Sequence, residues 1–178
     1  MLKYDIREGI GWLLVLRRNP NRTLQIIIQH IDNPSSDNMN RLQASHPYWS
    51  WYFDKKAVLL KRALWSEHII VRKLVLTIDS LYSFVNPDYL NALRANEEIL
   101  ERILNLAEGK IENSDFEERQ HAAFHLAFHF GLLPQQAGKM LSRTSSNVLS
   151  KQMTEDEVNG ICKTVREQLE IKKAATNK

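Results

Sequence analysis

The chain has 178 residues, 43% of them hydrophobic and 25% charged, with 24 Lys and Arg against 21 Asp and Glu. These proportions are typical of a globular domain and exclude a chain that is disordered over most of its length. The formal net charge of +3 permits a nucleic-acid or acidic partner without indicating one, because an electrostatic binding surface also needs its charges to be clustered.

The cysteine count and the N-terminal sequence exclude further classes of protein. Cys162 is the only cysteine, so no disulfide framework and no cysteine-based zinc site is built within the chain. Its place in a predicted amphipathic helix favours a buried, inert thiol. The apolar run Trp12–Leu16 is short and is followed at once by Arg17 and Arg18, unlike a signal peptide or a membrane span. We therefore expect a cytoplasmic protein without membrane contact.

Helical periodicity runs through the whole chain. Apolar residues recur at spacings of three and four, as on the buried face of a helix. The predicted apolar faces lie within Leu2–Leu14, Leu24–Ile31, Val58–Leu60, Ile70–Val85, Leu90–Leu104 and Val158–Leu169. The basic residues around the third and fourth of these are expected on solvated helix faces: Lys55, Lys56, Lys61, Arg62, Arg72 and Lys73.

Helix boundaries are marked in the second half of the chain. Asn86 before Pro87 is typical of a helix start, and Gly109 is typical of the end of that helix. Asp115–Glu118 and Thr154–Glu157 each have the three-residue spacing of a capping box. The sequence predicts an all-α fold, a multi-helix bundle or orthogonal array. We expect an N-terminal helical bundle over 1–109 and a C-terminal helix-turn-helix-like unit over 115–172, packed as one globular body.

Residues 118–150 have the layout of a helix-turn-helix. A long first helix ends at Gly131, a short second one runs from about Pro134 to Leu141, and a third runs from about Ser145 to Met153. Two helices that cross steeply over a short turn need a small residue where their backbones meet and an apolar anchor on each. Gly138 is the small residue, and Leu141 and Val148 are the anchors.

These residues resemble the promoter-reading C-terminal region of bacterial sigma factors and the related LuxR-type regulators. The resemblance covers residues 118–150 only and is carried by Glu118, Arg119, Gln120, Leu126, Gly131, Leu132, Gln135, Gln136, Ala137, Gly138, Leu141, Thr144 and Val148. The sequence departs from that pattern at Ser142 and Arg143, where such turns usually carry a glycine and an aliphatic residue. The third helix also lacks a run of arginines.

The resemblance implies that the third helix lies in the major groove of DNA. With Val148 facing inward, the outward face presents polar side chains that reach base edges, while neighbouring cations contact phosphates. The expected DNA contacts are Lys139, Arg143, Ser146, Asn147, Ser150 and Lys151. The alternative interpretation is a plain helical hairpin with a solvated surface rich in serine and asparagine.

Three histidines lie on one side of the predicted helix before Gly131. His121, His125 and His129 are spaced four residues apart, and two histidines at that spacing can chelate a metal. A zinc enzyme needs a third ligand and an ordered water, and neither is visible in the sequence. Buried histidines hydrogen-bonded to neighbours, or an interface that gains charge in acid, explain the pattern without metal. We expect neither a metal nor a cofactor.

An aromatic block precedes the basic helix, with Tyr48, Trp49 and Trp51 at its centre. Such a block can stack the bases of single-stranded nucleic acid, anchor a protein partner, or close the core between helices. Tyr48, Trp49 and Trp51 are our candidates for partner binding.

No motif for catalysis is present. The chain has no G-x-S-x-G elbow, no phosphate-binding glycine loop and no paired carboxylates. We expect a non-enzymatic, nucleic-acid-binding transcriptional regulator whose N-terminal bundle binds a protein partner or forms a homodimer. The alternative is a helical adaptor or a subunit of a larger protein assembly that does not contact DNA.

Overall fold

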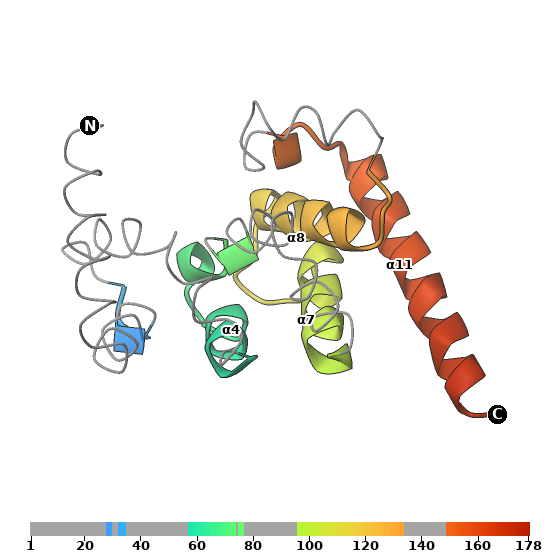
Figure 1. The fold of residues 1–178 in the computed structure, drawn as a ribbon. Coiled ribbons are helices and arrows are strands. Elements are labelled where there is room, and N and C mark those ends of the chain that lie inside the picture. Colours follow the sequence, from blue (N-terminus) through green and yellow to red (C-terminus); the bar gives the residue numbers. More distant parts are fainter. Residues whose placement is uncertain (1–27, 30–31, 35–56, 74, 77–95, 134–148) are drawn as a thin grey trace, which may run out of the picture. The chain divides into compact units, whose positions relative to one another are not determined.

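The computed structural model of this chain describes residues 28–29, 32–34, 57–73, 75–76, 96–133 and 149–178 (Figure 1). Every regular element in those residues is an α-helix, which confirms the all-α class. The chain divides into two compact units, Met1–Ile78 and Asp79–Lys178. Helix α7, Glu97–Ala107, lies in the second of these units.

In the first unit, the best-defined element is α4, Ala57–Leu64. Ala63 and Leu64 are buried at its end, and the Arg62 guanidinium forms two hydrogen bonds with the carboxylate of Asp32. The hydrogen bonds to Asp32 raise the pKa of Arg62. Residues 69–73 and 75–76 form a second helical stretch.

One basic residue of this unit is not solvated as the sequence analysis expected. Arg72 is buried, and its Nη1 donates a hydrogen bond to the carbonyl of Ser66 at 2.8 Å. Its neighbours Val71 and Val75 are buried too, so the arginine belongs to the packed side of the helix. A buried guanidinium needs its donors satisfied, and a backbone carbonyl at the start of the helix meets one of them.

The second unit begins in the described residues with α7, Glu97–Ala107. Asn96 is its N-cap: the residue is extended, and its side chain accepts a hydrogen bond from the amide of Ile99 at 3.3 Å. The expectation of one helix continuing from Pro87 into this segment is therefore wrong, because the asparagine interrupts it. The helix ends where predicted, at Gly109, whose φ of +74° lies in the left-handed region that favours glycine.

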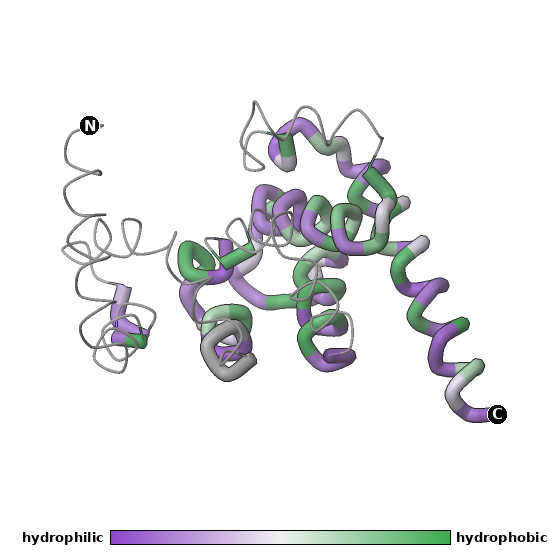
Figure 2. The backbone as a smooth tube through the Cα atoms, viewed as in Figure 1, coloured by the Kyte–Doolittle hydropathy of each residue, from purple (hydrophilic) through white to green (hydrophobic). Residues whose placement is uncertain are grey.

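Helix α8, Phe116–His129, is the central element of this unit. Asp115 accepts a hydrogen bond from the amide of Glu118 at 2.9 Å, which confirms the predicted cap. Gly131 ends the helix at φ +67°, and the amide of Leu132 donates to the carbonyl of Ala127 at 2.8 Å. Hydrophilic and hydrophobic residues alternate along α8 (Figure 2), yet ten of its fourteen residues are buried, as expected for a helix covered on several sides.

The last helix, α11, runs from Glu155 to Thr176 and begins at the predicted cap, where Thr154 accepts a hydrogen bond from the amide of Glu157. It continues past residue 172, the expected end of the unit. Its buried stripe follows helical spacing and consists of Val158, Cys162, Val165 and Leu169. Ile161, expected in that stripe, is only partly buried, and Cys162 takes its place.

The helices α7, α8 and α11 pack against one another in all three combinations. Their shared core contains the apolar stripe of α7, the small and aromatic residues of α8 and the stripe of α11. None of the helices in the described part of the chain has both the length and the apolar character needed to cross a membrane. Residues 134–148, the middle of the predicted helix-turn-helix segment, lie outside the described residues.

Candidate nucleic-acid interface

The residues predicted to contact DNA fall on both sides of a boundary in the structure. Lys139, Arg143, Ser146 and Asn147 lie outside the described residues, whereas Ser150 and Lys151 lie inside them. Residues 149–150 are helical and 151–152 form a turn that leads into α11. The described part of the candidate interface is therefore the end of the predicted third helix and the surface of α8 that holds it.

Ser150 does not face outward as predicted. Its side chain is only 1% exposed, and its hydroxyl lies 2.7 Å from Nδ1 of His121 on α8. The prediction fails because it took its inward direction from Val148 alone, and a polar side chain with a buried partner can occupy the inner face as well. In the structure Ser150 is therefore buried against α8 and does not lie on the outward face.

Lys151 is exposed, as predicted, with half of its side chain accessible. Its Nζ lies 3.3 Å from the carboxylate of Glu117 at the start of α8. The same carboxylate oxygen lies 3.4 Å from Nε2 of His121. Lys151 and His121 thus share one acidic partner, which links the outer and inner sides of the turn.

Gln120, on α8, holds the turn through two hydrogen bonds. Its side-chain amide donates hydrogen bonds to the carbonyl oxygens of Lys151 at 3.1 Å and Met153 at 2.8 Å. These carbonyls belong to the last residues of the predicted third helix, which in the structure is helical only to Ser150 and then turns, so that backbone acceptors there have no partner inside a helix. A buried amide with two donors satisfies both, so the chain between the third helix and α11 is held in one position on α8.

Glu117, His121 and Ser150 form a carboxylate–imidazole–hydroxyl series, the combination of groups used in nucleophilic catalysis. The hydroxyl is buried, and a nucleophile must reach its substrate to react. The geometry therefore serves attachment. A hydroxyl can donate to a neutral imidazole and accept from a charged one, so the contact with His121 survives in either protonation state.

Arg119 holds the three helices in register beside this site. Its Nε donates to the carbonyl of Ala107 at the end of α7 at 3.0 Å, and its Nη2 donates to Asn159 on α11 at 2.9 Å. The guanidinium also lies 3.6 Å from Glu155 and over the ring of Phe116. One arginine thus connects all three helices, as its planar group with five donors allows.

The remaining two histidines of the series are in the core. His125 and His129 are 0% exposed, and their Nε2 atoms lie 3.0 Å apart. Among the described residues, no three histidine, cysteine or carboxylate side chains come together as metal ligands. The arrangement of these two rings is that of a hydrogen-bonded pair.

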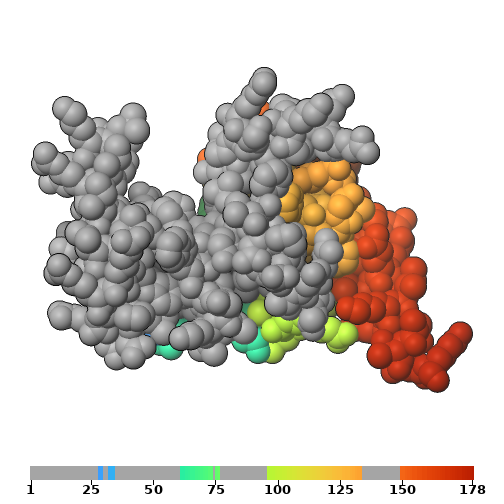
Figure 3. All heavy atoms as spheres, viewed as in Figure 1, coloured from blue at the N-terminus to red at the C-terminus, as the bar shows by residue number. Residues whose placement is uncertain are grey.

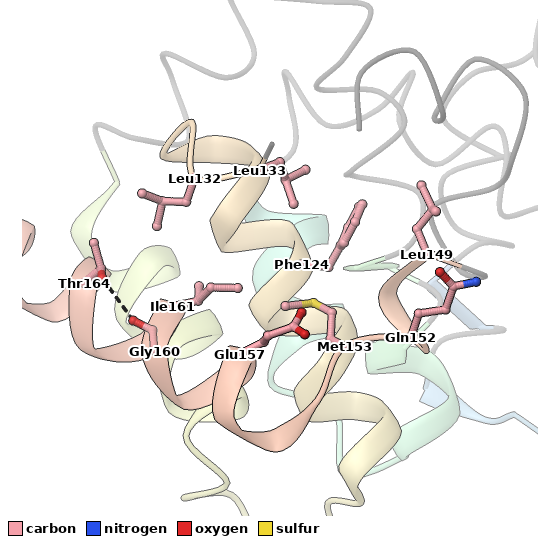
Figure 4. Close-up of a pocket in the computed structure, with 10 residues that line it drawn as sticks. All are labelled: Phe124, Leu132, Leu133, Leu149, Gln152, Met153, Glu157, Gly160, Ile161 and Thr164. Carbon is pink, nitrogen blue, oxygen red and sulfur yellow. Dashed lines mark hydrogen bonds between the residues drawn. The ribbon is translucent and has the colours of Figure 1, made fainter. Parts of the chain in front are cut away.

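A groove of about 710 Å³ lies between α8, the turn and the first half of α11 (Figure 4). Ile161 and Met153 point toward each other in it, and Phe124, Leu132, Leu133 and Leu149 add to its apolar lining. Glu157, Gln152 and Thr164 supply the polar part of its wall. Leu133 and Leu149 are the residues at which the described chain stops and resumes, so the groove borders the predicted helix-turn-helix segment.

The predicted partner-binding residues Tyr48, Trp49 and Trp51 lie outside the described residues. In the described part of the same unit, Trp65 is the large apolar side chain that reaches the surface, with 41% of it exposed. It follows directly after α4. A single exposed tryptophan does not by itself define a binding surface.

Gln120 and Glu117 were not predicted as site residues. Both act through partners about thirty positions away, and a single sequence carries no signal for such long-range pairs. Gln120 was noted only as part of the resemblance to sigma factors. Its position next to His121, one of the histidines for which burial and hydrogen bonding to neighbours were considered, was the available hint that it needs a buried partner.

Comparison of the chain with family models, with curated proteins and with solved structures finds no match.

Proposed function

We propose that this chain binds double-stranded DNA as a non-enzymatic helix-turn-helix regulator, with residues 134–153 as the contact element. The observation that supports the proposal is the attachment of the last residues of the predicted third helix, Ser150–Met153, to α8, through His121 with Ser150 and through Gln120. A reading helix must be held firmly by the first helix of the motif for its outward side chains to keep a fixed position in the groove. We keep the cytoplasmic location expected from the sequence as part of this proposal.

The proposed contact set is the predicted one without Ser150. Asn147 would form hydrogen bonds with an adenine edge, as the amide of asparagine does in the major groove. Ser146 would add a second polar contact, and the cations would contact phosphates. The set consists of Lys139, Arg143, Ser146, Asn147 and Lys151.

The charges near the turn set the strength of this interaction. Lys151 already has a carboxylate partner in Glu117, so a phosphate contact would exchange one anionic partner for another. The first turn of α11 adds three exposed acidic residues, Glu155, Asp156 and Glu157, which repel the DNA backbone. We therefore expect the net electrostatic gain to come mainly from Lys139 and Arg143, and the salt dependence to be moderate.

Fluorescence anisotropy of a mixed-sequence duplex, across a salt titration, tests the proposal. Binding of the full chain should weaken as salt rises, because counterions are released from the phosphates. Combining Asn147→Ala with Lys151→Ala should weaken binding at least ~10-fold, the effect expected for losing one base contact and one phosphate contact. Lys163→Ala, at an exposed position on α11, is the matched control and should bind as the wild type does. Absence of binding at low salt would refute the proposal.

A second candidate, the helical adaptor, is favoured by the end of α11. Leu169 is the last buried residue of the chain, and residues 170–178 are all exposed. Ile171 is 69% exposed, and the end of α11 projects from the surface in the space-filling view (Figure 3). A helix end without tertiary packing is only marginally stable, so a second protein surface against this turn would explain its regularity.

Light scattering of the purified chain tests the simplest form of this alternative, a homodimer through the end of α11. The mass should be that of a dimer, and Ile171→Glu should return it to that of a monomer. Lys163→Glu, on the same helix, is the control for the added charge. A monomer at every concentration would exclude self-association as the role of this surface.

A further inference from the structure

The positive charge of this chain belongs to its first unit. Residues 1–78 contain 12 Lys and Arg against 6 Asp and Glu, whereas residues 79–178 contain 12 against 15. The first unit thus has a formal net charge of +6 and the second one of −3. Because a polyanion is attracted to an excess of positive charge, the first unit is the more favourable place for an anionic partner.

The cations of the first unit are clustered around α4. Residues 55–73 contain six Lys and Arg and one acidic residue, Glu67. Of the six, Arg72 is buried and donates to a backbone carbonyl, so it does not face a partner. Among the described residues, the cations that reach the surface of this stretch are Lys61, Arg62 and Lys73. This is the clustering that an electrostatic binding surface requires.

Trp65 places an aromatic ring beside these cations. Its amide donates a hydrogen bond to the carbonyl of Lys61 at 2.9 Å, so the two residues lie one helical turn apart on the same side of the helix. Trp65 is 41% exposed, and the side chain of Arg62 is 48% exposed. Single-stranded nucleic acid is bound by this combination, in which the ring stacks on a base and the cations contact phosphates.

The ion pair of Arg62 is compatible with such a contact. Its guanidinium is hydrogen-bonded to the carboxylate of Asp32, and that side chain is 36% exposed. Ion pairs exposed to water contribute little to stability. A phosphate can therefore take the place of the carboxylate, and its binding exchanges one anionic partner of the guanidinium for another.

We propose that the first unit binds single-stranded nucleic acid through the α4 surface, defined as Lys61, Arg62 and Trp65. A base stacks on Trp65, and phosphates contact the two cations. Stacking accepts any base, so binding is independent of sequence. A duplex fits less well because its bases are already stacked on one another. The sequence directly before α4 contains the same two kinds of side chain, the aromatic block and then Lys55 and Lys56.

The tryptophans of the chain give a direct readout. All four belong to the first unit, so tryptophan fluorescence reports on that unit alone. Titration of the full chain with a short labelled oligo(dT) at low salt should quench this fluorescence as the anisotropy of the label rises, because a base stacks on an indole. Saturable binding without a change in tryptophan fluorescence would overturn the proposal, and so would the absence of binding.

Removal of two cations tests the position of the surface. Lys61→Gln with Arg62→Gln should lower the slope of log K against log salt by about 1.4, since each phosphate contact on a single strand contributes about 0.7. Lys172→Gln with Lys173→Gln removes the same charge from the exposed end of α11 and should leave the slope unchanged. Equal effects of the two pairs would overturn the proposal. The fluorescence of the wild type remains decisive if the first pair does not fold.

Two further measurements separate this surface from other interactions. Trp65→Leu should weaken binding of oligo(dT) at least ~5-fold, the effect of losing one stacked base. Polyglutamate at the same concentration of charge has no bases and should compete poorly. Competition as effective as that of unlabelled oligo(dT) would overturn the proposal in favour of an acidic protein partner. Asn147→Ala with Lys151→Ala should bind oligo(dT) as the wild type does, so this proposal and the proposed duplex contact succeed or fail independently.

Discussion

The hydroxyl of Ser150 and Nδ1 of His121 lie 2.7 Å apart, although 29 positions separate the two residues in the sequence. This contact turns a residue of the predicted DNA-reading face into an attachment point on α8. Its neighbour Lys151 has half of its side chain exposed, since successive residues in a helical turn point in directions about 100° apart. Of these two adjacent residues, Ser150 therefore lies on the inner side of the candidate interface and Lys151 on the outer side.

Loss of the Ser150 hydroxyl should destabilise the unit. Ser150→Ala removes the hydrogen-bond partner of His121 in a buried site, for which we expect a loss of about 1–2 kcal/mol in the free energy of unfolding. Urea denaturation followed by circular dichroism measures this loss. Lys151→Ala is the control: because its side chain is exposed, its effect should stay within about 0.5 kcal/mol. Equal effects of the two substitutions would contradict the inward position of Ser150.

Gln120 should be among the more sensitive polar residues of α8. Gln120→Ala leaves the carbonyl oxygens of Lys151 and Met153 without their described donor, and an unsatisfied buried acceptor costs about 1–3 kcal/mol. Chemical denaturation measures the change, with Gln168→Ala at an exposed position of α11 as the matched control. If Gln120→Ala unfolds at the same urea concentration as the control, the turn is not held by this amide.

The sequence predicted where helices begin and end better than it predicted which distant residues contact each other. Asp115, Thr154, Gly109 and Gly131 mark helix boundaries that the structure confirms, because caps and left-handed glycines act on backbone groups only a few residues away. Asn96 shows the limit of this reasoning. Asn96 caps the start of α7. This cap outweighs the apolar periodicity, which by itself favours one continuous helix from Pro87.

Side-chain direction was harder to predict than helix position. Ser150 and Arg72 are polar residues that the sequence analysis placed toward solvent, and both are buried against a specific acceptor or donor. Composition predicts which side chains prefer water on average. It does not reveal a partner that comes from another segment, and the attachment of the turn to Gln120 was invisible for the same reason.

Substitutions at three glycines distinguish the cost of backbone strain from the cost of steric contact. At Gly109 a new Cβ would lie 3.2 Å from Cδ of Arg119, and φ is +74°; at Gly131 φ is +67° and no atom lies within 4 Å. Both Gly109→Ala and Gly131→Ala should destabilise by about 1–2 kcal/mol through the left-handed backbone, and Gly109→Ala should lose more because Arg119 must shift.

The third glycine, Gly160, is the control, because its substitution should change the stability in the opposite direction. Gly160 lies inside α11 with open space around it, so Gly160→Ala should stabilise the chain by about 0.5–1 kcal/mol through helix propensity. Thermal and urea unfolding of the three variants give the ranking. A Gly109→Ala variant as stable as Gly131→Ala would show that Arg119 yields without loss of its contacts to α7 and α11.

The thiol of Cys162, in the core, ionises only at alkaline pH. Burial, followed by the negative charge of Glu108, raises the pKa of its thiol from about 9.0 to about 11. At pH 8 the folded chain should then hold a thiolate fraction about 100-fold smaller than the unfolded chain, and reaction with a thiol reagent such as DTNB should slow accordingly. A rapid reaction of the folded protein would show that the thiol is accessible.

The same shift in the pKa of Cys162 fixes the sign of a stability change. The folded thiol keeps its proton up to a higher pH than the unfolded one, so its contribution is complete below about pH 9 and declines as the pH rises toward 11. Between pH 8 and 10 this decline should amount to about 1 kcal/mol. Cys162→Ala lacks the titrating group, so its free energy of unfolding should fall less than that of the wild type over this interval. Measuring both proteins by urea denaturation at the same pH values separates the thiol from the lysines and tyrosines, which titrate equally in the two. A parallel decline in both would mean that the Cys162 thiol ionises as easily in the folded chain as in the unfolded one.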